Sequence, residues 1–407
     1  MIDNKFFENL LIFLIILSAL LVRLPMLESI DFLPMKQTIS FIETKNIYLN
    51  YGKPANDIDL IVSNAQMSQV SKRELPIVEN FFGYIYYFVG YEAIYIPKLF
   101  SIFAWILSSL YLFKILKIFF TFNTSSLSTL IYLNIPFGVL ISRSYLTEPY
   151  LIAFFSIAIF YIIKFKDEKN LKNFILAVIP ALILSLLKID YIILISFFYL
   201  FYCFFYQGFK KSFLDLYNYL FATLLICSMF FYLENIIYDE NLNSFIKTQF
   251  NFFLLFNVSF WLGWIAQISI VTTLPILLLV LISILSSRID KKFNSLSYSL
   301  LLAYILKSLL QTYYVSSHDY YNVSLILISS IIGGYFINSF VNFDSIFRKI
   351  PRFIFFMLVL LIFSLNSGIE IFKTNYDRKA RMENNEVNNA KKIGKLLNNN
   401  TNILFLS

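Results

Sequence analysis

The chain has 407 residues, of which 58% are hydrophobic, 19% aromatic and only 14% charged, and its mean hydropathy is +0.70. Soluble domains are about 45–50% apolar and about 25% charged, so the composition excludes an ordinary soluble protein. The net charge of +8 does not indicate a nucleic-acid partner, because the basic residues lie between apolar runs, where membrane topology signals belong.

Apolar runs long enough to cross a bilayer recur along the chain, since a helix needs about 20 residues to span the hydrocarbon core. In chain order they cover 6–26, 95–120, 126–142, 148–165, 171–187, 190–207, 216–236, 264–286, 297–315, 321–341 and 352–370. They predict an all-α polytopic membrane protein of about 11 transmembrane helices, built as one domain over residues 1–370.

The short segments between spans differ in charge. Five of them, "FKILKIF", "KFKDEKNLKN", "QGFKKS", "SSRIDKKFN" and "IFRKIPR", each hold at least two lysines or arginines, whereas "SRSYLTEP", "KIDY" and "SSHDYY" hold one or none. The positive-inside rule places the first group in the cytoplasm. We therefore predict a multi-pass protein of the cell (inner) membrane, with a cytoplasmic N-terminus and an extracytoplasmic C-terminus.

Two long segments fall on the predicted outer side, 27–94 and about 237–263. A loop as long as the first is uncommon unless it is functional. Its end, "PIVENFFGYIYYFVG", is too short and too aromatic for a span and predicts a helix lying on the membrane surface. The polar, asparagine-rich residues 371–407 predict an extracytoplasmic tail.

The polar residues that stand out in this apolar sequence map to the same outer side. They are Asp31 after the first span, Glu74 near the end of the long loop, Arg143 and Glu148 after the third span, Lys188 and Asp190 at the end of the fifth, and the only histidine, His318, followed by Asp319, Tyr320 and Tyr321. A charge at mid-bilayer costs about 2.5–3.5 kcal/mol on insertion scales. Their common level predicts a polar cavity at the outer membrane boundary.

Each residue alone also has a structural explanation. Asp31 is equally suited to cap an interfacial helix, and Glu74 to form a surface ion pair with its basic neighbours. Arg143 is suited to pair with the nearby acid at a helix junction, and His318 to bond a backbone carbonyl. The tyrosines fit an aromatic belt, and Lys307, inside the ninth span, either snorkels or faces the cavity.

Four stretches together resemble the membrane glycosyltransferases that use polyprenyl-phosphate sugars, among them protein O-mannosyltransferases and the lipid A aminoarabinose transferase. These stretches are "DFLPMKQT" from Asp31 to Thr38, "RELPIVENFFGYIYYFVG", "SRSYLTEP" and "SHDYYNVSLILISSIIGGY". Many bacterial members look like Asp-x-x-Pro-Met-Arg-Gln at the first and His-x-Tyr-Tyr at the last. The resemblance covers most of the chain and implies the GT-C fold, in which outer loops form a catalytic crevice above a helical bundle.

The resemblance implies transfer of a hexose or pentose from a polyprenyl-phosphate donor to a glycan, lipid or protein acceptor at the outer face. By position, Asp31 matches the catalytic acid of the first outer loop, Glu74 the Glu of a Glu-Lys-Pro-Pro motif, and Glu148 the acid of the second outer loop. The chain departs where Leu75 replaces a lysine that in some members meets the lipid phosphate, and where Leu33 interrupts the polar run after Asp31. The remaining candidates for binding the phosphate are Lys72, Arg73, Arg143 and Lys188.

The residue types suit this chemistry. An acceptor hydroxyl must lose a proton as it attacks the anomeric carbon, and we assign Asp31 as the general base, with Glu74 as a second catalytic carboxylate. Glu74 and His318 are candidate ligands for a divalent Mg, Mn or Zn ion, or contacts to sugar hydroxyls. The expected substrate pocket comprises Lys36, Gln37, Glu148, His318, Asp319, Tyr320 and Tyr321.

Three other functions remain open. A transporter or flippase for a lipid-linked saccharide would also need basic and aromatic outer residues, but it should have broken helices near mid-membrane, and the spans contain few glycines or prolines. An O-antigen ligase or polymerase shares the lipid donor, but its long outer loop usually comes late in the chain. An inactive scaffold is the third.

Overall fold

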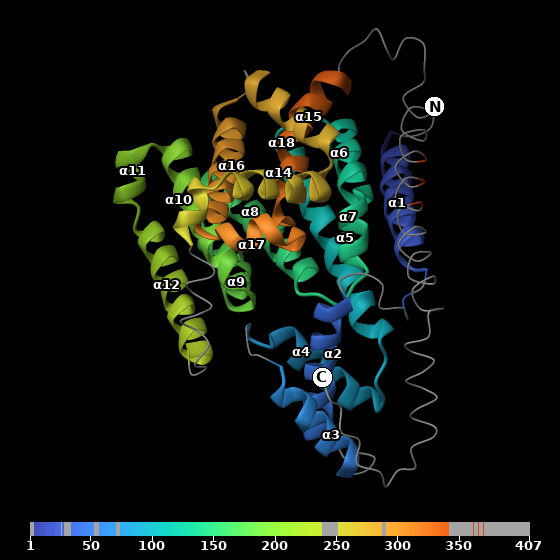
Figure 1. Cartoon of the computed structure of the whole chain (residues 1–407). Coiled ribbons are helices and arrows are strands. Elements are labelled where there is room, and N and C mark those ends of the chain that lie inside the picture. Colours follow the sequence, from blue (N-terminus) through green and yellow to red (C-terminus); the bar gives the residue numbers. More distant parts are fainter. Residues whose placement is uncertain are drawn as a thin grey trace.

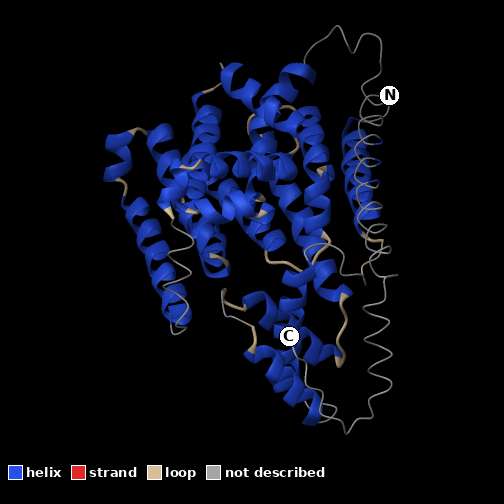
Figure 2. Cartoon of the chain, viewed as in Figure 1, coloured by secondary structure: helices blue, strands red, loops and turns tan. Residues whose placement is uncertain are grey.

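A computed structural model describes residues 4–25, 34–52, 57–70, 74–237, 251–286 and 290–341, with single positions at 27, 361, 365 and 369. Within these ranges all regular structure is helical, and Figure 2 shows no strand there. Apart from those single positions, the predicted span 352–370 and the tail 371–407 lie outside the described residues. So do Asp31, Lys72 and Arg73.

The helices follow the predicted spans closely. The first four helices are α1 (Asn4–Arg23), α2 (Pro34–Tyr51), α3 (Asp57–Ser68) and α4 (Ile77–Val89). Next come α5 (Tyr95–Lys117), α6 (Phe122–Asn134), α7 (Pro136–Ser142), α8 (Glu148–Asp167), α9 (Leu171–Leu187), α10 (Ile189–Gln207), α11 (Phe209–Leu214) and α12 (Leu216–Ile237). The last group is η1 (Phe252–Phe256), α14 (Val258–Thr272), α15 (Leu274–Ser286), α16 (Lys291–Leu310), α17 (Thr312–Ser317), η2 (Asp319–Asn322) and α18 (Ser324–Val341).

Among the described residues, six helical segments are long and apolar enough to cross a membrane: α5, α8, α10, α12, α16 and the segment Asp319–Ser339. Two bent helix pairs raise the number to eight if each pair is one span. The chain is therefore an α-helical multi-pass membrane protein. The finer count of eleven spans stays a prediction.

Two predicted spans are broken rather than straight. The span at 126–142 bends by 65° between α6 and α7, and that at 264–286 bends by 102° between α14 and α15. Pro136 explains the first bend, because the residue before a proline is disfavoured in the helical region and Ile135 is extended, with ψ 123°. Arg23 of α1 then donates to the freed carbonyl of Leu133 at 2.6 Å.

Two other boundaries also differ from the predicted ones. The span expected at 297–315 runs from Lys291 to Leu310, because the Asp290 side chain accepts the Lys292 N–H and caps the helix start. The segment expected to be a loop up to residue 263 contains η1 and the first turns of α14, whose N-cap is Asn257. Local capping side chains, rather than hydropathy, set these ends.

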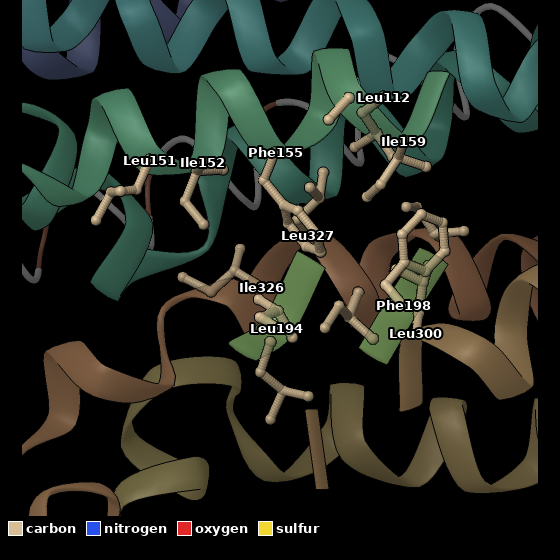
Figure 3. Packing of buried hydrophobic residues seen from close by; sticks show 14 of the residues in the cluster. Leu112, Leu151, Ile152, Phe155, Ile159, Leu194, Phe198, Leu300, Ile326 and Leu327 are labelled. Carbon is tan, nitrogen blue, oxygen red and sulfur yellow. The ribbon is translucent and has the colours of Figure 1, made fainter. Parts of the chain in front are cut away.

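The core of the bundle lies between helices far apart in the sequence. α8 packs between α5 and α9, α10 packs against α16, and α18 packs against α6 and α15. Figure 3 shows Phe155 of α8 close to Phe198 of α10, Leu300 of α16 and Leu327 of α18. All four side chains are fully buried.

The first predicted outer loop folds into its own helical unit, α2 to α4, at one end of the bundle (Figure 1). α2 packs against both α3 and α4. The expected helix at "PIVENFFGYIYYFVG" is α4, which ends at Gly90, where a φ of +83° suits glycine. The close approach of α4 to α2 depends on Gly83, since a Cβ there would lie 2.5 Å from Cγ2 of Ile47.

Candidate functional site

A chain of ion pairs joins the outer-loop unit to the bundle. Lys36 of α2 donates to Oε1 of Glu148, at the start of α8, over 2.5 Å. Lys188, at the junction of α9 and α10, donates to the same oxygen over 3.1 Å, and its Nζ lies 3.8 Å from Oε1 of Glu74. Four charged side chains from four parts of the sequence therefore form one cluster, which we call the ionic cluster.

A second, fully buried ion pair lies on neighbouring helices. Nζ of Lys307, in α16, lies 3.5 Å from Oδ2 of Asp190 in α10 and donates to the backbone carbonyl of Tyr321 over 2.5 Å. Lys307 is therefore neither snorkelling nor lipid-facing. The sequence marked both positions as unusual, but only the packing of α10 against α16 pairs them.

Two tyrosine rings cover the lysines. Nζ of Lys36 lies 4.2 Å from the ring centroid of Tyr320, and Nζ of Lys188 lies 4.3 Å from that of Tyr321. A cation over an aromatic face gains about 0.5–2 kcal/mol, more when water is excluded. The rings therefore offset part of the repulsion between the two ammonium groups that converge on Glu148.

Exposure divides the ionic cluster into a buried base and an accessible edge. The side chains of Glu148 and Lys188 are 0% and 4% exposed, whereas those of Lys36 and Glu74 are 24% and 30% exposed. Burial alone would lower the pKa of Lys188, but the carboxylates of Asp190, Glu148 and Glu74 outweigh it and hold its pKa well above the usual value. A ligand approaching from solvent would meet Lys36 and Glu74 first.

The turn between α7 and α8 holds the outer-loop unit in place. Oε1 of Gln37 accepts the backbone N–H of Tyr145 at 2.9 Å, and the hydroxyls of Thr44 and Tyr145 lie 2.6 Å apart. Nη2 of Arg143 donates to the carbonyl of Pro25, which ties the turn to the end of α1. Gln37 and Arg143 thus help to position the ionic cluster. Both are buried, so neither lies at its accessible edge.

One buried acid in the outer-loop unit was not anticipated. Glu79 of α4 is 7% exposed, and its Oε1 accepts the hydroxyl of Ser40 at 2.9 Å. Burial raises the pKa of Glu79 from 4.5 to about 7. The sequence offered a weak signal, a single acid within an aromatic helix.

His318 and Asp319 lie beside the cluster in local contacts. Nδ1 of His318 is 2.7 Å from the Ser317 hydroxyl, and the imidazole lies among tyrosine rings, with that of Tyr314 at 5.6 Å. The carboxylate of Asp319 accepts the backbone N–H of Tyr320. Within the described ranges, no three His, Cys, Asp or Glu side chains are placed to hold a metal ion. Nζ of Lys188 lies 3.8 Å from Oε1 of Glu74, and the metal site expected at Glu74 and His318 stays a prediction.

The structure thus brings together six of the predicted site residues: Lys36, Glu74, Glu148, Lys188, Tyr320 and Tyr321. Arg143 donates to the backbone carbonyl of Pro25, and its ion pair with Glu148 stays a prediction. Asp31, Lys72 and Arg73 lie outside the described residues.

No family model, curated protein or solved structure matches the chain.

Proposed function

We propose that the protein is a membrane glycosyltransferase that moves a sugar from a polyprenyl-phosphate donor to a glycan, lipid or protein acceptor at the outer face of the cell membrane. The observation that carries this proposal is the ionic cluster. Lys36 of the outer-loop unit and Lys188 of the bundle converge on one carboxylate oxygen, with Lys36 partly exposed. The proposal includes the GT-C arrangement, eleven spans and a cytoplasmic N-terminus.

Lysines at this place suit a lipid phosphate. The leaving group of the reaction is an anionic polyprenyl phosphate, and charge-assisted contacts to it stabilise the charge that develops as the bond to the sugar breaks. Lys36 is the accessible cation, and Tyr320 at 4.2 Å fixes its position. Glu148 is a positioning residue, because it holds both lysines while remaining buried itself.

Asp31 acts as the general base. It precedes the first residue of α2, Pro34, by three positions, and Lys36 follows in the first turns of that helix. The acceptor hydroxyl gives its proton to the carboxylate as its oxygen bonds to the anomeric carbon. The bond from that carbon to the phosphate oxygen breaks, and the electron pair leaves with the phosphate. Glu74, 30% exposed, faces the oxocarbenium-like centre or a sugar hydroxyl.

A transfer assay tests the proposal. Membranes containing the protein are supplied with radiolabelled polyprenyl-phosphate sugars, and transfer to endogenous acceptors is followed. We expect Asp31→Asn to lower the rate by about 10²–10⁴-fold, the usual contribution of a general base, while Asp57→Asn, a matched change in the same outer loop, keeps it. Full transfer by Asp31→Asn would overturn the mechanism.

Donor binding is tested separately by native mass spectrometry with polyprenyl phosphate alone. Lys36→Ala should weaken binding about tenfold, since a charge-assisted contact contributes about 1.5–3 kcal/mol. The control Lys114→Ala removes an exposed lysine near the C-terminal end of α5. It should leave the affinity for polyprenyl phosphate unchanged. Equal weakening by both changes would show that the effect is one of total charge.

A lipid-linked saccharide transporter is a second candidate, favoured by the two bent helix pairs. Discontinuous helices form substrate sites near mid-membrane in many transporters. Here, however, Arg23 bonds the carbonyl freed at the α6–α7 bend, so that break already has an internal partner. Movement of a fluorescent polyprenyl-phosphate sugar across proteoliposomes, unchanged in Asp31→Asn, would favour the transporter.

A further inference from the structure

A mostly apolar groove runs along α10. Its volume is about 330 Å³, and its walls are formed by α10 and α12, with α11 at one end. Along α10 it extends from Ile192 to Phe204, a distance of about 18 Å at 1.5 Å per helical residue. This matches one leaflet of a bilayer, whose full hydrocarbon core is about 30 Å thick.

The groove opens sideways, toward the surrounding membrane. Leu200 and Ile226 line it and are 42% and 51% exposed. Its walls are mostly apolar, and Ser196 near its middle contributes a small side chain. α12 is the least buried of the six candidate spans. In its 18-residue apolar stretch 22% of the residues are buried, against 67% for α8. The shape suits a single hydrocarbon chain.

One end of the groove is polar and basic. Asn218 lines it, and its Oδ1 accepts from Lys166 at 2.6 Å and from the hydroxyl of Tyr199 at 2.8 Å. Beside this end, α11 carries the exposed residues Lys210 and Lys211, and neither forms an ion pair within the described part of the chain. The next acid along the sequence, Asp215, pairs with Lys169 at 2.8 Å.

We propose that this groove binds one anionic glycerophospholipid, with an acyl chain between α10 and α12 and the headgroup phosphate at Lys210 and Lys211. Basic residues at the membrane surface attract anionic headgroups, and the apolar groove buries a chain of matching length. A polyprenyl chain is much longer than this groove, which α11 closes at one end. The headgroup end of the site is separate from the ionic cluster, because Asn218 and α11 lie near the C-terminal end of α10 whereas Lys188 lies at its N-terminal end.

Native mass spectrometry of the delipidated full chain in neutral detergent tests the site. Phosphatidylglycerol and phosphatidylcholine with the same acyl chains are titrated separately. We expect one preferred phosphatidylglycerol site, weakened about tenfold or more in the double variant Lys210→Ala/Lys211→Ala. The matched control, Lys114→Ala/Lys117→Ala, removes two exposed lysines at the same end of the bundle on α5 and should bind as the wild type does.

A second pair of variants tests the groove itself. Ser196→Trp fills it and should abolish the preferred site, while Leu110→Trp adds the same side chain to the lipid-facing side of α5 and should leave it unchanged. Equal affinity for the two lipids, wild-type affinity in Ser196→Trp, or tighter binding of polyprenyl phosphate at this site would each overturn the proposal. Thermal melting confirms that each variant is folded.

Discussion

Lys36 donates to Glu148 over 2.5 Å although 112 positions separate the two residues in the chain. The contact joins α2 of the outer-loop unit to the first turn of α8 in the bundle. Because Lys188 shares the same carboxylate oxygen, Glu148 is the common partner of two cations. The charge balance of the candidate site therefore depends on this one side chain, which also adds to the contacts of Gln37 and Thr44 that hold the outer-loop unit.

Replacing Glu148 by glutamine should destabilise the protein. Lys36 and the buried Lys188 would lose their shared counter-charge, and removing one partner of a buried ion pair costs about 3–5 kcal/mol. Thermal unfolding in detergent measures the change. The control is Glu168→Gln, an exposed acid just after α8, which should change stability by less than about 0.5 kcal/mol. Equal melting temperatures for the two variants would contradict the assigned role.

The stability of the outer-loop unit should fall as the pH rises from about 5 to about 7. Burial raises the pKa of Glu79 from 4.5 to about 7, so in this window the folded protein keeps a proton that the unfolded chain releases, and unfolding is favoured. At 1.36 kcal/mol per pKa unit the loss is about 3 kcal/mol, complete above pH 7.

The pH dependence is checked by melting curves of the wild type and Glu79→Gln. The variant cannot ionise, so it should show a smaller fall in melting temperature across the window and should be the more stable protein at about pH 8. Parallel pH profiles for the two proteins would exclude Glu79 as the cause.

Gly83→Ala should separate α4 from α2. The added Cβ would lie 2.5 and 2.9 Å from two atoms of Ile47, a stiff β-branched side chain, and overpacking costs about 1–3 kcal/mol. Gly333→Ala in α18 is the matched change, because a Cβ there meets nothing within 4 Å. It should be neutral or stabilising by up to about 1 kcal/mol. Similar effects of both changes on melting temperature would show that the helix contact is not the reason.

The ring of Tyr320 should contribute to the position of Lys36. Tyr320→Leu removes the aromatic face at 4.2 Å from Nζ and should cost about 0.5–2 kcal/mol. Tyr320→Phe keeps the ring and should stay within about 0.5 kcal/mol of the wild type. Thermal unfolding distinguishes them, and a loss in Tyr320→Phe as large as that in Tyr320→Leu would assign the effect to the hydroxyl.

Hydropathy by itself determined the class of the protein and most of its helices. The predicted spans at 148–165, 171–187 and 190–207 match α8, α9 and α10 within two residues at each end. Such segments can be predicted from the local sequence, because a helix that crosses a membrane must form its backbone hydrogen bonds within itself and be apolar along its length. The long first loop and the helix at α4 were also evident from the sequence.

Only the tertiary structure decided which polar residues meet. The sequence placed Lys36, Glu148 and Lys188 on one side of the membrane, but their common contact arises from the packing of α2 onto the α7–α8 turn. Helix packing likewise brings Lys307 to Asp190, and it places Arg143 where its guanidinium donates to the Pro25 carbonyl. Hydropathy fixes the depth of a residue in the membrane, whereas its neighbours depend on how the helices pack laterally and rotate about their axes, which is set by contacts between distant segments.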